Sequence, residues 1–137
     1  MALPFRKRPG VAVVEIHGVI GNQIRTPAYA RLFDNIAQNK RYRALLLDID
    51  SPGGSASGSE VLHHRLLKVA ESKPIVAYVL GIGASGAYYL CSAASRVVAL
   101  PCAMVGSLCV VSLRPFLVPL VASVVVSFSL SQPRRLP

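Results

Sequence analysis

Strand-like and helix-like segments alternate along the chain, and this alternation constrains the fold more than any other feature. Residues 11–16, 44–50 and 75–80 are apolar runs rich in β-branched or aliphatic side chains, which predict strands. Apolar side chains at helical spacing follow the first two runs, over residues 26–37 and 58–71. Because parallel strands need such crossover helices, the sequence predicts an α/β domain with a largely parallel sheet.

Local signals refine this prediction. Thr26 and Pro27 are typical of a helix cap followed by a first-turn proline. The second apolar run is nearly continuous, as in a strand buried on both faces of a parallel sheet. After the third run we expect a turn over residues 81–86, a small-residue helix through Ala94 and a short strand over residues 96–100.

Composition and charge exclude several classes of protein. The chain has 137 residues, 53% of them hydrophobic, which excludes a disordered chain. Its net charge is +9, but the basic residues are dispersed without aromatic interleaving, so nucleic-acid binding is not expected. Three cysteines are too few for a disulfide framework and too scattered for a zinc site. We therefore expect no metal and a reducing, intracellular setting.

The two ends of the sequence bear on membrane association. Residues 1–10 are basic, with no apolar stretch behind them that would predict a signal peptide. The uncharged residues 115–130 are interrupted by Pro119 and fall short of the roughly 20 residues that a spanning helix needs. We interpret them as a buried strand, and we expect a cytoplasmic protein, with peripheral membrane contact left open.

The glycine-rich turn after the third run fits two functional motifs imperfectly. Residues 81–86 match the dinucleotide-binding pattern G-x-G-x-x-G, but no acidic residue follows Glu71 to bind a ribose. No cofactor is therefore expected. The same turn nearly matches the nucleophile elbow G-x-S-x-G, with Ser85 as the nucleophile and Ala87 in place of the last glycine. All three histidines precede Ser85, which excludes the chain order of an α/β-hydrolase triad.

A second turn, with Gly53 and Gly54, follows the second predicted strand. The carboxyl ends of parallel strands meet at one edge of a sheet, so this turn and Ser85 are expected to face each other. A serine opposite glycine amides is the arrangement that acyl transfer requires. Two tight turns without chemistry remain the alternative at this point.

Three ordered motifs add a family resemblance that covers residues 11–115. They are DIDSPGGS at 48–55, GASGAYY at 83–89 and VGSL at 105–108. Together they resemble peptidase family S49, the signal peptide peptidase A family of the ClpP/crotonase superfamily. The resemblance implies a ClpP/crotonase-like ββα-spiral, ring-like homo-oligomers and a serine–lysine dyad. It implies Ser85 as nucleophile, with oxyanion amides from Gly53 or Gly54 and from Gly86.

The sequence departs from the family at two places. The family's general-base lysine lies some tens of residues after the serine, whereas all four lysines here precede Ser85. Arginine cannot replace it, because its pKa keeps it protonated. Cys109 also stands where the family has a glycine. We therefore expect a basic N-terminal segment (1–10), an S49-like domain (11–115) and a divergent apolar segment (116–137) that reflects a truncation or frameshift.

The function expected from this resemblance is that of a serine endopeptidase acting on cleaved signal peptides or membrane-associated peptides, impaired by the missing base. Its expected partners are peptide substrates and further copies of the chain. Two alternatives stay open. One is an inactive S49-like fragment or assembly subunit, and the other is a crotonase-like acyl-CoA enzyme.

The remaining polar and sulfur-containing side chains receive structural interpretations. His63 and His64 are adjacent on a helix and cannot share a face, which favours surface positions over a metal pair. Asp48 and Asp50 share one strand face, and Asp50 is expected to cap the glycine turn. The sequence also predicts buried positions for Cys91, Cys102 and Cys109. Tyr88 and Tyr89, just after Ser85, are expected to pack beneath its turn rather than line a substrate groove.

Overall fold

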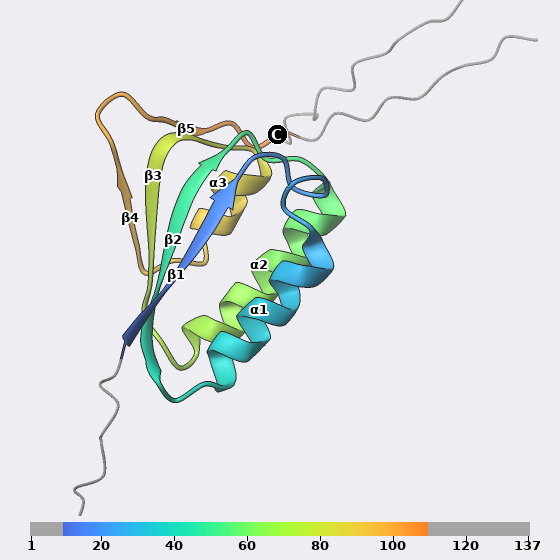
Figure 1. Cartoon of the computed structure of the whole chain (residues 1–137). Helices are drawn as coiled ribbons and strands as arrows, with labels where there is room; N and C mark the ends of the chain where they lie inside the picture. Colours follow the sequence, from blue (N-terminus) through green and yellow to red (C-terminus); the bar gives the residue numbers. More distant parts are fainter. Residues whose placement is uncertain (1–9, 110–137) are drawn as a thin grey trace, which may run out of the picture.

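The computed structural model describes residues 10–109, which form a parallel sheet covered on one face by helices (Figure 1). The sheet order is β1-β2-β3-β4, and a short strand β5 pairs with the end of β3. The pairings in this sheet are parallel. In chain order the elements are β1 (Gly10–His17), α1 (Thr26–Gln38), β2 (Tyr42–Ser51), α2 (Ala56–Ala70), β3 (Ile75–Ala84), α3 (Gly86–Cys91), β4 (Arg96–Ala99) and β5 (Met104–Gly106). The predicted α/β class and largely parallel sheet are confirmed.

The core lies between the sheet and the helices. In β2 every second side chain is fully buried, namely Leu45, Leu47 and Ile49. On the other face of the sheet, Leu46 is half-buried and Val13 of β1 is exposed. The prediction that this strand, the second apolar run, is buried on both faces is therefore wrong for the described residues. The helices within residues 10–109 cover only one face of the sheet (Figure 1).

Three local predictions also need correction. Arg25, not Thr26, is the N-cap of α1, and Pro27 lies in the first turn as expected. β3 does not end at residue 80 but continues through the glycines to Ala84, because β5 pairs with residues 82–84. α3 ends at Cys91, so the small-residue helix is shorter than predicted.

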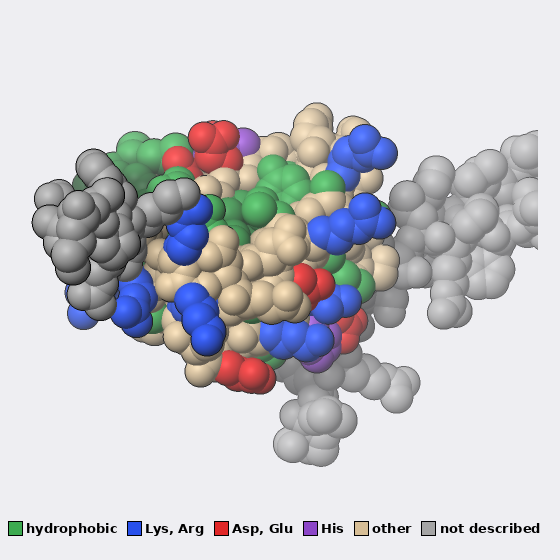
Figure 2. All heavy atoms as spheres, turned by 60° about the horizontal axis from the view of Figure 1, so that its bottom comes forward, with side chains coloured by type: hydrophobic (Ala, Val, Ile, Leu, Met, Phe, Trp, Pro, Cys, Tyr) green, Lys and Arg blue, Asp and Glu red, His purple; other side chains and the backbone are tan. Residues whose placement is uncertain are grey.

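The surface of the described residues has mixed charge. Figure 2 shows Lys and Arg side chains spread over one face with acidic side chains between them. None of the helices within residues 10–109 is long and apolar enough to cross a membrane. The strand predicted within residues 115–130, and the predicted segments 1–10 and 116–137 for all but Gly10, lie outside the described residues.

Candidate active site

The two glycine-containing turns meet at one edge of the sheet. Ser85 lies between the end of β3 and the start of α3, and Gly53 lies between β2 and α2. A Cβ atom built on Gly53 would lie 2.9 Å from the Cβ of Ser85 and 2.7 Å from the amide nitrogen of Gly86. The structure therefore brings together Ser85, Gly53 and Gly86, and the contact leaves no room for a side chain at Gly53.

The Gly53 turn is held by the loop after β1. The Ser51 hydroxyl donates to the Gly18 carbonyl (2.6 Å) and accepts from the Gly53 amide (3.1 Å). The Ile20 amide donates to the Gly53 carbonyl at 2.8 Å. Gly54 has φ +148°, and a Cβ there would overlap the main chain of Ile20. A glycine pair is needed because both sides of this turn contact backbone.

Asp50 has a different role from the one predicted. The β2–β3 register shifts between Ile49 and Ser51, and the Asp50 carboxylate accepts a hydrogen bond from the Ile82 amide at 3.0 Å. It thus links two strands, while the hydroxyl of Ser51 caps the glycine turn. On the same face of β2, Asp48 lies 3.4 Å from the imidazole of His17.

Ser85 has a backbone conformation that is unusual for a residue with a side chain. Its φ is +51° and its ψ is −121°. The Ser85 amide donates to the Gly106 carbonyl at 3.1 Å, so β5 holds this turn in place. The Ser85 side chain makes no capping hydrogen bond to α3. Strained positions of this kind persist where the surrounding structure enforces them, and a strained strand-to-helix turn is typical of a nucleophile elbow.

The backbone amides around Ser85 differ in their hydrogen bonds. The Gly53 amide is already bonded to Ser51. Gly86 is the first residue of α3, a position whose amide has no intrahelical acceptor. Within residues 10–109, the turn and loop hydrogen bonds include none donated by the amides of Gly54 or Gly86. These two amides are therefore available to an added acceptor.

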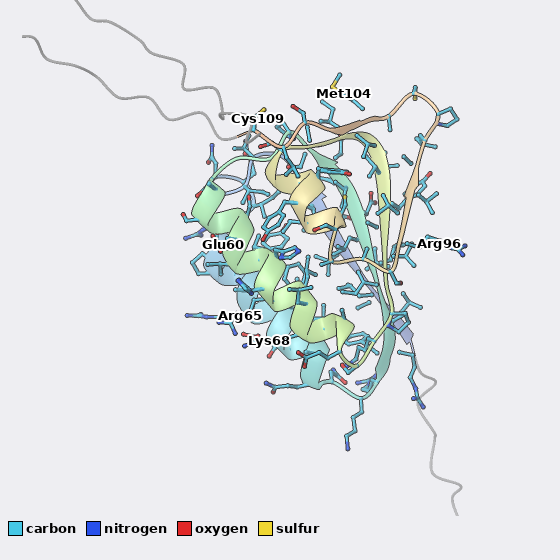
Figure 3. All side chains as sticks on the ribbon, turned by 180° about the vertical axis from the view of Figure 1, so that it is seen from behind. Glu60, Arg65, Lys68, Arg96, Met104 and Cys109 are labelled. Carbon is cyan, nitrogen blue, oxygen red and sulfur yellow. The ribbon has the colours of Figure 1, made fainter. Side chains whose placement is uncertain are left out.

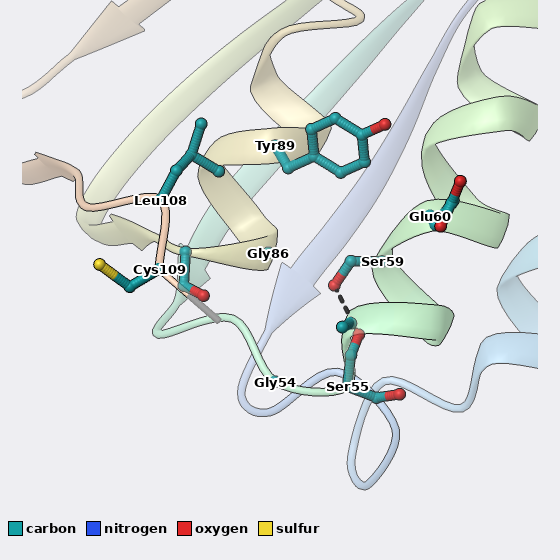
Figure 4. Close-up of a pocket in the computed structure, with 10 residues that line it drawn as sticks. Gly54, Ser55, Ser59, Glu60, Gly86, Tyr89, Leu108 and Cys109 are labelled. Carbon is teal, nitrogen blue, oxygen red and sulfur yellow. Dashed lines mark hydrogen bonds between the residues drawn. The ribbon is translucent and has the colours of Figure 1, made fainter. Parts of the chain in front are cut away.

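A cleft of about 670 Å³ opens beside Ser85 (Figure 4). The first turns of α2 form one wall, and Tyr89 with the segment after β5 forms the other. Ser85 and Gly86 also line the cleft. The lining residues are Gly54, Ser55, Ala56, Ser59, Glu60, Ser85, Gly86, Tyr89, Leu108 and Cys109.

His63 is buried, so the predicted surface position is wrong for it, whereas His64 is exposed as predicted. The His63 ring stacks on Tyr89 with centroids 4.0 Å apart and an interplanar angle of 18°. Its Nε2 lies 3.1 Å from the Ser92 hydroxyl, which itself donates to the Tyr89 carbonyl. Burial, then the neighbouring His64, lowers the pKa of His63, while Glu60 opposes the shift. Sequence reasoning missed this packing because His63 and Tyr89 lie on different helices, far apart in the sequence.

The other predicted aromatic and sulfur positions divide between core and surface. Cys91 is buried as predicted, and burial raises the pKa of its thiol to about 11. Cys102 and Cys109 are exposed, which contradicts their predicted burial. Cys109 lines the cleft because it follows β5 past the serine turn. The prediction that both tyrosines pack beneath the serine turn is wrong, because Tyr89 stacks on His63 and lines the cleft, and Tyr88 is exposed.

The described lysines lie away from Ser85. Lys73 is buried, and its ammonium donates to a carbonyl at the end of α1. Lys40 lies in the connection from α1 to β2. It therefore lies at the end of the sheet where the parallel strands begin, whereas Ser85 lies at the end where they finish. Lys68 is in the last turn of α2, and Figure 3 shows it farther along this helix than Glu60. No cluster of three potential metal ligands occurs within residues 10–109.

Comparisons with known proteins find similarity to one peptidase family. The model of Peptidase family S49 matches residues 68–132. "Serine protease SPPA, chloroplastic" of Arabidopsis thaliana is 32% identical over 110 residues, and Protease 4 of Salmonella typhi is 31% identical over 105 residues. These alignments cover 78% and 72% of this chain but only 16% and 17% of the relatives, so the chain spans a small part of the length of each. The resemblance to peptidase family S49 is confirmed.

Solved structures agree on the fold. A serine-to-alanine mutant of the 1510-N membrane-bound stomatin-specific protease matches with a TM-score of 0.62 and 21% identity, over 76% of this chain and 50% of that one. A lysine-to-alanine mutant of the same protease, in complex with a substrate peptide, matches equally well, with a TM-score of 0.62. The chain therefore has the ClpP-like α/β fold of the S49 proteases.

The Gly53 contact predicts the effect of Gly53→Ala. A Cβ would collide with the Ser85 turn, and the positive φ of +93° is unfavourable for alanine. We expect a loss of at least about 1–2 kcal/mol in the free energy of unfolding, measured by urea denaturation. Gly10→Ala is the matched control, because a Cβ there meets nothing within 4 Å. Equal stability of the two variants would contradict the contact.

The lowered pKa of His63 predicts a pH-dependent stability. The unfolded state binds a proton at His63 as pH falls through about 6.5, whereas the folded state resists protonation until a lower pH. This site therefore destabilises the fold as pH decreases below about 6.5. In urea denaturation, compared at neutral and mildly acidic pH, His63→Gln should reduce the pH dependence, and His64→Gln should change it less. An unchanged dependence in His63→Gln would contradict the assignment.

Proposed function

We propose that this chain forms the nucleophile-bearing part of an S49 serine peptidase. Ser85 attacks the carbonyl carbon of a peptide bond held in the adjoining cleft. The observation that carries this proposal is the strained turn that presents Ser85 against the Gly53 backbone. Strained backbone positions cluster at active sites, and this one lies beside free amides and a cleft.

The oxyanion of the tetrahedral intermediate is bound by backbone amides. Gly86 supplies one from the start of α3, and Gly54 supplies the other. Gly54 is favoured over Gly53 because the Gly53 amide is bonded to Ser51 at 3.1 Å. Such preorganised donors stabilise charge where it develops in the transition state.

The proton of Ser85 needs a base, and the described residues supply no lysine for it. A serine hydroxyl is a weak nucleophile until a base accepts its proton. Lys73 and Lys68 are placed elsewhere, and no lysine follows Ser85 in the 137-residue sequence. If the reaction uses the serine–lysine dyad that the family resemblance implies, the lysine comes from outside these residues, from a further segment or a second chain.

The substrates we propose are cleaved signal peptides or other membrane-associated peptides. Two similarities support this substrate class: the relative described as SPPA, and the neighbour described as a membrane-bound stomatin-specific protease. A crotonase-like acyl-CoA enzyme would use two amide donors without a serine nucleophile. The strained Ser85 at φ +51° favours the peptidase over that alternative.

Reaction of Ser85 with a fluorophosphonate probe tests the nucleophile. We expect slow covalent labelling of the 137-residue chain, no labelling of Ser85→Ala, and retained labelling of Ser57→Ala, a neighbouring exposed serine on α2. Labelling that persists in Ser85→Ala would contradict the nucleophile.

Peptide hydrolysis by the same chain tests the need for a base. Turnover should be slow, and adding an S49 segment that carries a lysine should accelerate it about 10²–10⁴-fold, the usual contribution of general-base assistance. The Ser85→Ala chain with the same added segment is the control and should stay inactive. Rapid Ser85-dependent hydrolysis without the segment would contradict the need for an added base.

We also propose that the chain self-associates. Val11, Val13 and Val98 are exposed on the sheet face that the described helices leave open. Exposed apolar patches of this kind often mark interfaces. Sedimentation equilibrium at micromolar concentration should give at least twice the chain mass of 14.6 kDa. A stable monomer would exclude this proposal.

A further inference from the structure

The cleft beside Ser85 combines an apolar wall with a single carboxylate. Leu108 and the ring of Tyr89 supply apolar surface, whereas Ser55, Ser59 and Glu60 line the α2 side (Figure 4). Of the lining residues, Glu60 alone carries a charged side chain. A ligand group that matches both walls has an apolar stem and a cationic end.

The Glu60 carboxylate is available to such a cation. Its side chain is 66% exposed, and its one ion-pair partner within the described residues is His64, at 3.9 Å. Both side chains of that pair are exposed, which makes the pairing weak. The next cation along α2, Arg65, is already bound to Asp34 at 3.0 Å. No strong internal pair therefore has to break before Glu60 binds a ligand.

The aromatic wall is held in a fixed position. Tyr89 stacks on the buried His63, and Ser92 links that imidazole to the Tyr89 carbonyl. This packing joins α3 to α2, the two helices on either side of the cleft. A wall that is ordered before binding costs less conformational entropy when a ligand packs against it.

We propose that this cleft binds a lysine or arginine side chain of the peptide substrate, so that Glu60 determines specificity. The methylene stem packs on Leu108 and Tyr89, and the ammonium or guanidinium group pairs with Glu60. Long basic side chains bury their stems on apolar surface in this way while their charge stays near water. The inference rests on the proposed function, because it takes a peptide to be the ligand.

The net charge of the chain does not favour a cationic peptide, so the proposed preference for lysine or arginine depends on Glu60 itself. At +9 overall, the chain repels a cationic peptide at long range, so the attraction must come from the carboxylate at the cleft. Exposed pairs are screened by salt, and the preference should therefore weaken as ionic strength increases. A preference that came from apolar contact alone would not weaken with salt.

Peptide binding to the Ser85→Ala chain tests the proposal without turnover. Fluorescein-labelled alanine-rich peptides that differ at one position, lysine, norleucine or glutamate, are titrated in fluorescence anisotropy. Norleucine keeps the apolar stem of lysine and lacks the cation. We expect the lysine peptide to bind about two- to fivefold more tightly than the norleucine peptide, as for an exposed ion pair. Glu60→Gln should abolish this difference and Glu60→Lys should reverse it.

Glu71→Gln is the matched control, because Glu71 is exposed at the other end of α2. It should keep the lysine preference. A preference that survives in Glu60→Gln, or that is lost equally in Glu71→Gln, overturns the proposal, as does a lack of binding by all three peptides. The outcome is separable from that of the proposed function. Lysine preference without fluorophosphonate labelling of Ser85 would refute the peptidase alone, and labelling without the preference would refute the Glu60 assignment alone.

Discussion

The close contact between the Gly53 backbone and the Ser85 turn is the constraint on which the rest of the site depends. Because Gly53 has no Cβ, the turn after β2 can approach the Gly86 amide closely. The backbone of that turn and the backbone of the Ser85 turn therefore lie side by side. Both turns follow neighbouring parallel strands, so the sheet supplies the alignment. The alignment alone is not sufficient, because any side chain at Gly53 would separate the turns.

Two different parts of the chain keep this contact in place. On one side, the loop after β1 binds the glycine turn through Ser51 and Ile20. On the other side, β5 extends β3 and accepts the Ser85 amide at Gly106. The strain at Ser85 is thus maintained by hydrogen bonds to segments distant in sequence. This explains why a serine can occupy a conformation that otherwise favours glycine.

Local patterns in the sequence predicted the fold better than they predicted contacts between distant residues. The β-α alternation predicted the parallel sheet, and the glycines that follow the strands predicted which turns would meet. The stacking of His63 on Tyr89 does not follow from spacing along the chain. β5 shows this limit most clearly, because its three residues carry no strong strand pattern, yet their pairing turns residues 82–84 into strand and positions Ser85. Short edge elements acquire their structure from the strand that they join.

The proposed reaction needs two kinds of group. The fold supplies the backbone amides that bind the oxyanion, but it does not supply the base that activates the serine. The oxyanion donors are backbone amides, so they depend on turn geometry and tolerate change in most side chains. Serine activation depends instead on one side chain with the correct pKa and position. A chain can therefore keep the S49 fold and a preorganised oxyanion site while its described lysines serve other purposes, as Lys73 does at the end of α1. In the reaction that we propose, stabilisation of the oxyanion and proton transfer are therefore separable, and the fold by itself accounts only for the first.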